Sequence, residues 1–106
     1  NKKDRNGDTP LINACKNGHM NIIEYLIDLG ANVNKGDNNT PLLIACENGN
    51  ETLVKYLVEK RAEVNRGEFT TPLISACENE NESIVHYLLE HGADINAEDE
   101  NGNTPL

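Results

Sequence analysis

One short stretch of sequence recurs along this chain at a nearly constant interval. "TPLINACKNGH" begins at Thr9, "TPLLIACENGN" at Thr40 and "TPLISACENEN" at Thr71, and the letters TPL return at Thr104. Successive starts lie 31, 31 and 33 residues apart. A period of this length is typical of proteins in which one small structural unit is stacked on the next.

The start of each copy predicts a short helix. The threonine of TPL suits the N-cap, because its hydroxyl can accept a hydrogen bond from an unpaired backbone N–H, and the proline suits the first helical position. Gly18 and Gly49 suit the end of this helix, because glycine takes the left-handed conformation readily. The third copy has Glu80 there, which predicts either local strain or a differently closed turn. Arg61 likewise replaces the glycine that follows the second helix at Gly30 and Gly92.

The second half of each copy predicts another helix with one wide apolar stripe. The stripe comprises Ile22, Ile23, Leu26 and Ile27, then Leu53, Val54, Leu57 and Val58, and then Ile84, Val85, Leu88 and Leu89. Tyr25, Tyr56 and Tyr87 recur at its edge, where we expect them to pack in the stack. Two such short helices cannot bury both of their faces alone, so copies must stack on one another to close a core.

These repeated motifs resemble those of a known family. "TPLINA", "TPLLIA" and "TPLISA" match the pattern T-P-L-H-x-A except at the histidine, and the stretches 17–34 and 91–106 also fit. The whole chain is therefore similar to the ankyrin repeat family. The resemblance implies an all-α fold, a solenoid of stacked helix-turn-helix units joined by short β-hairpin-like loops. We expect a single domain over 1–106, with repeats at about 5–35, 36–66 and 67–99 and the start of a fourth at 100–106.

The chain departs from the family pattern in two ways. The histidine that helps to tie neighbouring copies together in the family is replaced by Ile12, Leu43 and Ile74. We therefore expect this stack to depend more on apolar contact. The loops that lead to the second and third TPL are also two residues shorter than the usual pattern, which predicts stubbier loop tips, a shallower groove and positive φ at Gly36 and Gly67.

Charge and composition exclude several classes of protein. Residues 1–35 hold five basic and four acidic residues, giving +1, whereas the remainder holds four basic and fourteen acidic residues, giving −10. A field of that sign repels phosphate backbones, so we expect no nucleic-acid partner for the C-terminal two thirds. No apolar run suits a membrane span, and the polar start has no secretory apolar region. We expect an intracellular protein, cytoplasmic or nuclear.

The chemistry-bearing residues predict no catalytic, cofactor or metal site. Cys15, Cys46 and Cys77 recur every 31 residues, too far apart in a stack to form disulfides, so we interpret them as small buried hydrophobic residues in a reducing compartment. His86 and His91 are five apart rather than at the spacing of a helical metal pair. The phosphate-binding and nucleophile motifs are lacking as well.

The resemblance leaves two roles open for the asparagine that recurs in each loop. Asn34, Asn65 and Asn96 stand where ankyrin proteins can be hydroxylated by an asparaginyl dioxygenase. The alternative is a structural role, because asparagine readily hydrogen-bonds to the backbone of a loop.

The resemblance also places the partner-binding surface. In the family, partners dock on the loop tips and on the exposed inner side of the first helix, which together form a concave face. By position these residues are Arg5, Asn6, Asp8, Lys16, Asn17, Asp37, Asn39, Glu47, Asn48, Glu68, Phe69, Glu78, Asn79, Glu100, Asn101 and Asn103. The second and third copies are acidic along this line, which predicts a basic protein segment as the partner. Phe69 is either a binding anchor or a ring folded back on the next loop.

We therefore expect a noncatalytic protein–protein interaction module. The alternative is a regulatory or scaffolding ankyrin segment of a larger enzyme or channel whose catalytic part is absent here. The third copy has no polar cap after it, and repeat arrays need one for solubility. This predicts either that more repeats follow or that copies associate end to end through the uncapped terminal repeat.

Overall fold

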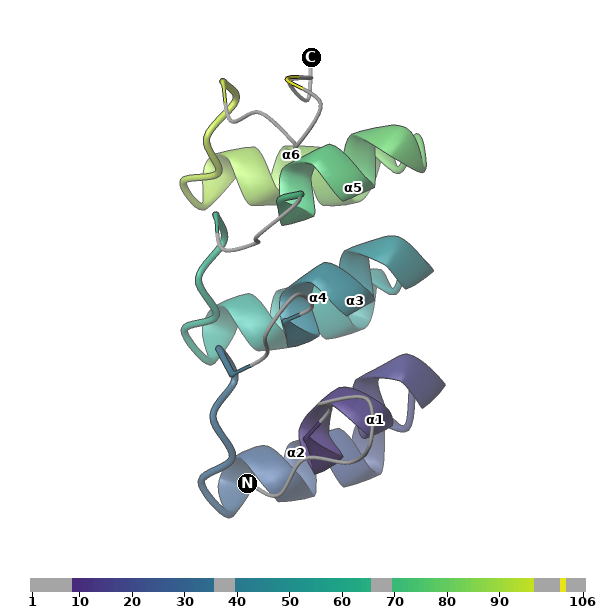
Figure 1. Cartoon of the computed structure of the whole chain (residues 1–106), viewed down its shortest axis with the longest axis vertical. Helices are drawn as coiled ribbons and strands as arrows, with labels where there is room; N and C mark the ends of the chain where they lie inside the picture. Colours follow the sequence, from purple (N-terminus) through teal and green to yellow (C-terminus); the bar gives the residue numbers. More distant parts are fainter. Residues whose placement is uncertain (1–8, 36–39, 66–69, 97–101, 103–106) are drawn as a thin grey trace.

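The chain folds as a stack of helix pairs, in agreement with the predicted all-α solenoid (Figure 1). The computed structural model describes residues 9–35, 40–65, 70–96 and Gly102. Within them lie α1 (Pro10–Asn17), α2 (Met20–Asp28), α3 (Pro41–Asn48), α4 (Glu51–Glu59), α5 (Pro72–Glu78) and α6 (Glu82–Glu90). We call α1/α2 pair 1, α3/α4 pair 2 and α5/α6 pair 3. No strand occurs in these ranges, and the shortened loop tips with Gly36 and Gly67 lie outside them.

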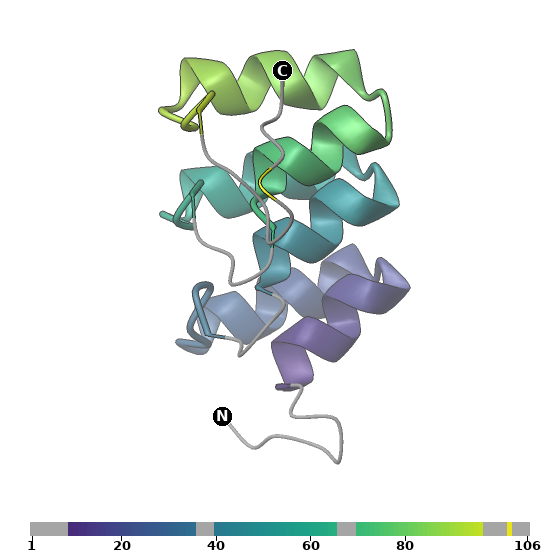
Figure 2. The same cartoon turned by 45° about the horizontal axis from the view of Figure 1, so that its top comes forward.

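The pairs repeat one arrangement along the long axis of the molecule. Each first helix packs on its own second helix, α1 contacts α3, α3 contacts α5, and α4 contacts α6. The turned view separates a layer of first helices from a layer of second helices (Figure 2). The turns within the pairs lie along one edge of the stack, and the segments that follow the second helices lie along the opposite edge (Figure 1).

Each first helix begins as the sequence predicts. The Oγ1 atoms of Thr9, Thr40 and Thr71 accept hydrogen bonds from the backbone N–H three residues later, at 3.2, 3.3 and 3.3 Å. All three threonines are buried, and a proline occupies the first turn of each helix. The buried hydroxyl therefore satisfies a helix N–H that the stack shields from water.

The first helices end in a left-handed residue in all three pairs. Gly18 and Gly49 have φ of 68° and 67°, and Glu80 at the equivalent position has φ of 56°. The Glu80 N–H donates to the carbonyl of Cys77 at 3.0 Å, as Gly18 donates to Cys15 at 3.1 Å. The turn thus closes in the same way without glycine. Of the two predicted outcomes, local strain and a differently closed turn, the structure therefore shows the first.

The core is aliphatic and runs through the whole stack. The positions that replace the family's histidine, Ile12, Leu43 and Ile74, are all buried, so apolar contact replaces a hydrogen bond there as expected. Cys15 and Cys46 are also buried and free, in agreement with a packing role. Cys77 is free but only half-buried, so the prediction of full burial is wrong at this position.

Recurrent asparagines connect each helix pair to the next one. The Asn34 side chain donates to the Arg61 carbonyl at 3.2 Å and accepts from the Glu63 N–H at 2.7 Å. Asn65 does the same to the carbonyl of Gly92, at 3.1 Å, and the N–H of Asp94, at 2.6 Å. Each amide therefore uses both of its ends to hold the turn that follows the next second helix. These bonds tie neighbouring copies rather than a single loop.

We expect Glu80→Gly to stabilise the fold, because it removes a side chain from a left-handed backbone. The gain should be about 1 kcal/mol, or about 4–8 °C in the melting temperature of a domain this small. Thermal unfolding followed by circular dichroism measures it. Ser83→Gly, at an exposed site inside α6, is the control and should lower the melting temperature instead. An unchanged or lower melting temperature for Glu80→Gly would contradict the strain.

We expect Asn65→Ala to destabilise the stack by about 1–2 kcal/mol, because two hydrogen bonds between pairs are lost. Urea unfolding of both proteins measures the difference. Asn17→Ala is a suitable control, since the Asn17 amide donates to the Asn13 carbonyl of its own helix. Equal stability of Asn65→Ala and the original protein would show that these bonds contribute nothing.

Candidate functional site

Six of the predicted partner-binding residues lie in the described part of the chain. They are Lys16, Asn17, Glu47, Asn48, Glu78 and Asn79, and all six are exposed. The other predicted residues lie outside the described ranges: Arg5, Asn6, Asp8, Asp37, Asn39, Glu68, Phe69, Glu100, Asn101 and Asn103. The structure therefore places the part of the predicted surface that belongs to the first helices.

Three charged side chains form a row across the stacked first helices. Lys16, Glu47 and Glu78 occupy equivalent positions in the last turn of α1, α3 and α5, and these helices contact one another in that order. Equivalent positions on stacked helices lie about 8–10 Å apart. We call these residues the charged row.

The pKa of Glu47 depends on the charges of the other two residues in the charged row. Partial burial raises the pKa of the Glu47 carboxyl, the neighbouring Lys16 ammonium lowers it, and the Glu78 carboxylate raises it. The net shift is upward, so the protonated form of Glu47 is favoured relative to that of an isolated glutamate. Burial and the Glu78 carboxylate together therefore outweigh the effect of the Lys16 ammonium on the pKa of Glu47.

Of the asparagines beside the charged row, Asn79 connects two neighbouring helix pairs. Asn79 Nδ2 donates to the carbonyl oxygens of Cys46 and Glu47, at 3.4 and 3.3 Å, and so ties α5 to the last turn of α3. Asn17 Nδ2 donates within its own helix to the Asn13 carbonyl at 2.9 Å. The Asn79 amide thus holds the backbone that carries Glu47, while its own side chain remains exposed.

The reactive side chains of the described part do not converge. Burial raises the pKa of the Cys15 and Cys46 thiols to about 12, so both remain protonated and poorly nucleophilic at neutral pH. His91 stacks on the Tyr87 ring with centroids 4.1 Å apart. No three His, Cys, Asp or Glu side chains in the described ranges come together in a way that could hold a metal ion.

One exposed surface differs from what the sequence predicts. Ile22 belongs to the expected buried stripe, but it is 50% exposed, and Tyr25 and Leu29 on the same helix are also exposed. The equivalent residues Leu53 and Ile84 are fully buried. Periodicity alone cannot distinguish them, because burial at this position depends on a neighbouring pair.

We expect the pKa of the Glu47 carboxyl to lie above that of an ordinary glutamate. Glu78→Gln should lower this pKa and Lys16→Gln should raise it, because the first removes a repelling charge and the second an attracting one. Carboxyl-detected NMR titration measures both shifts. Glu82→Gln, an equal charge change on α6, serves as the control. If all three variants moved the pKa equally, the row would not be coupled.

No helix in the described ranges is long and apolar enough to cross a membrane.

Comparison with known proteins agrees with the geometry. A family described as "Ankyrin repeats (3 copies)" matches residues 1–68 and 66–106. Alpha-latrotoxin-Lt1a of Latrodectus tredecimguttatus is 50% identical over 32 residues, and alpha-latrotoxin-Lg1a of Latrodectus geometricus is 53% identical over 32 residues. Each match covers 30% of this chain and 2% of the toxin, so the similarity is confined to about one repeat of much longer proteins.

The family match extends over the whole chain and agrees with the stacked helix pairs, the capping threonines and the turn after each first helix. Proteins with such repeats generally bind other proteins, and their repeat domains are typically noncatalytic. This chain belongs to the ankyrin repeat family.

Proposed function

We propose that this chain binds a basic segment of a partner protein, laid across the stack along the charged row. The supporting observation is the placement of Glu47 and Glu78 at equivalent exposed positions on the contacting helices α3 and α5. The pKa of Glu47 is raised first by partial burial, lowered by Lys16 and raised by the Glu78 carboxylate. A lysine or arginine of the partner placed between these two carboxylates would relieve the repulsion. The acidic balance of the C-terminal two thirds would also speed the approach of a basic partner.

The spacing of the row suggests how such a segment is built. Stacked helices lie about 8–10 Å apart, and a polyproline II peptide presents every third side chain on the same side after about 9 Å. Two basic residues three positions apart would therefore match Glu47 and Glu78. Lys16 continues the row with the opposite charge and favours an acidic residue three positions further on.

The loop-tip residues complete this proposal. We include Arg5, Asn6, Asp8, Asp37, Asn39, Glu68, Phe69, Glu100, Asn101 and Asn103 in the same binding surface, on the strength of the family resemblance. Glu68 and Glu100 would add acidic charge for the same partner, and Phe69 would supply an apolar anchor.

We expect a labelled 12-residue peptide with the pattern Lys-x-x-Lys-x-x-Glu to bind this chain, and Glu47→Gln with Glu78→Gln to weaken the binding about tenfold. Two exposed charge pairs, each contributing about 0.5–1 kcal/mol, give this magnitude. Fluorescence anisotropy measures the affinity, with the peptide pattern tested in both chain directions. Added salt should weaken the binding, because the charges are exposed.

The matched control is Glu51→Gln with Glu82→Gln. This double variant changes the net charge by the same amount, but the changed residues lie on the second helices α4 and α6. Glu51 Oε1 lies 3.6 Å from Lys55 Nζ. A second control peptide has the same composition with its two lysines adjacent. If both double variants weakened binding equally, the row would have no specific role. If the two peptides bound equally, the proposed spacing would be wrong.

A further inference from the structure

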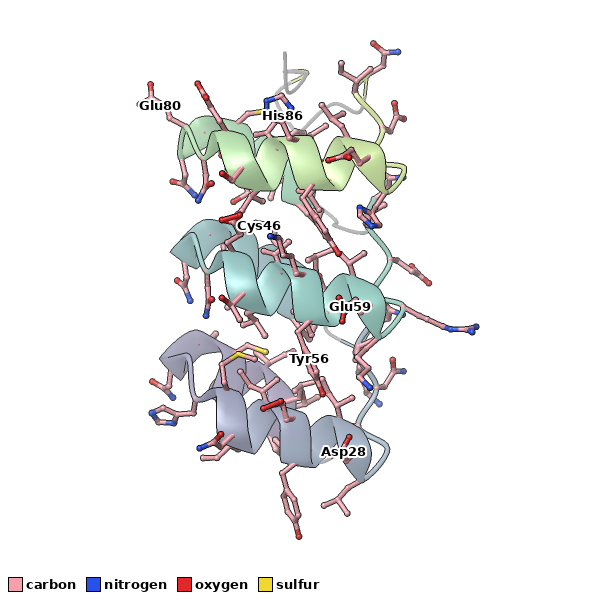
Figure 3. All side chains as sticks on the ribbon, turned by 180° about the vertical axis from the view of Figure 1, so that it is seen from behind. Asp28, Cys46, Tyr56, Glu59, Glu80 and His86 are labelled. Carbon is pink, nitrogen blue, oxygen red and sulfur yellow. The ribbon has the colours of Figure 1, made fainter. Side chains whose placement is uncertain are left out.

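The first helix of pair 3 ends differently from those of pairs 1 and 2. α1 and α3 extend to Asn17 and Asn48. α5 instead ends at Glu78, and the equivalent Asn79 follows it as the C-cap, with φ −88° and ψ 3°. Glu80, the next residue, is left-handed and projects outward from the edge of the stack that carries the turns within the pairs (Figure 3). Asn79 therefore lies directly between the last residue of α5 and a sharp turn.

The Asn79 amide completes the hydrogen bonding at the end of α3. The Gly49 N–H donates to the Cys46 carbonyl at 3.2 Å. The Glu47 carbonyl is one of the last four of the helix, which have no partner within it. Asn79 Nδ2 donates to the Glu47 carbonyl at 3.3 Å and to the Cys46 carbonyl at 3.4 Å. One side chain of pair 3 thus satisfies the helix end that carries Glu47.

The equivalent asparagine of pair 2 makes no such link to pair 1. Asn48 is the last residue of α3, and its side chain makes no hydrogen bond to α1 in the ranges that the structure describes. The charged row has two gaps, one on each side of Glu47. The gap between Glu47 and Glu78 is tied by the Asn79 amide, whereas Asn48 does not tie the gap between Lys16 and Glu47.

The Asn79 amide links the two carboxylates of the row through few atoms. Asn79 directly follows Glu78 in the chain, and its amide is bonded to the backbone of Glu47. The two carboxylates repel each other, as the contribution of Glu78 to the pKa of Glu47 shows. Without the amide, a small shift of α5 along α3 would let the carboxylates move apart.

We propose that Asn79 is a positioning residue of the charged row: its amide fixes the separation of Glu47 and Glu78 and so sets the spacing of the positive charges that the surface accepts. The family resemblance predicts a direct contact between Asn79 and the partner, whereas here Asn79 acts through the backbone of Glu47. This role rests on the proposed function, because the spacing matters to a partner only if a basic segment lies along the row. Charges that are already in place also need less ordering when the partner binds.

Two peptides test this role by fluorescence anisotropy: the one with the pattern Lys-x-x-Lys-x-x-Glu and the one with adjacent lysines. The original chain should bind the first about threefold more tightly, because adjacent lysines reach only one carboxylate well. Asn79→Ala should bring this ratio of affinities close to one. Asn79→Asp should do the same, because a carboxylate cannot donate to the two carbonyls, although its added charge tightens the binding of both peptides.

Asn65→Ala is the matched control for the peptide experiment. Asn65 ties the same two pairs at the opposite edge of the stack, through bonds to Gly92 and Asp94 (Figure 1). Asn65→Ala should leave the ratio unchanged, although it also removes two hydrogen bonds between pairs. If Asn79→Ala weakened both peptides equally, Asn79 would contact the partner directly, which overturns the positioning role. An equal loss of the ratio in Asn65→Ala overturns it as well.

A titration without peptide separates failure of this role from failure of the proposed function. Glu78→Gln should lower the pKa of Glu47 by less in the Asn79→Ala background than in the original chain, because the two carboxylates have moved apart. Lys16→Gln should raise the pKa of Glu47 by the same amount in both backgrounds. Carboxyl-detected NMR measures these shifts.

The two experiments together give a decision in every case. If the original chain bound neither peptide, the proposed function would fail, and the titration alone would decide the role of Asn79. An equal effect of Glu78→Gln on the pKa of Glu47 in both backgrounds overturns the positioning role, whether or not the peptides bind.

Discussion

Leu53 and Ile84 are fully buried because a neighbouring helix pair covers the side of the helix on which they lie. The equivalent Ile22 in pair 1 is half-exposed, which shows how much of this burial comes from the neighbour. Helices of seven to nine residues are marginal in isolation, so contact between pairs supplies the stability that the single pair lacks. The alignment of the charged row depends on this contact.

Hydrogen bonds between neighbouring helix pairs add to the apolar contact and fix the orientation of one pair against the next. The family's histidine is replaced by buried aliphatic residues, which pack well but do not fix one pair against the next at a defined angle. The amides of Asn34 and Asn65 do so at one edge of the stack, since each binds a donor and an acceptor in the next turn. Asn79 does so at the other edge, where it binds the end of α3. The asparagines thereby limit how far neighbouring pairs can rotate.

These hydrogen bonds bear on the proposed binding of a basic peptide. A basic peptide meets carboxylates at a regular spacing only if the first helices stay in register, and Asn79 holds the carbonyl of the residue that forms the middle of the row.

The sequence by itself determined the helix pairs, their caps and the order of stacking. These features follow from local chemistry: a threonine three residues before a free N–H, a proline in the first turn, and apolar residues at helical spacing. The local rule also identified Glu80 as the residue in a turn that normally needs glycine. Six of the predicted binding residues could be placed on exposed helix ends for the same reason.

Only the tertiary structure decided which residues at equivalent positions differ in burial and in their contacts. Ile22 and Leu53 have the same place in the repeat, yet one is exposed and the other buried, because burial depends on what lies across the helix. The partners of Asn34 lie 27 and 29 residues away, a distance at which sequence spacing carries no information about contact. The coupling of Glu47 to Lys16 and Glu78 likewise arises from stacking alone. Every copy carries the same local sequence pattern, so the pattern does not reveal which contacts form between helix pairs. Only the structure shows those contacts.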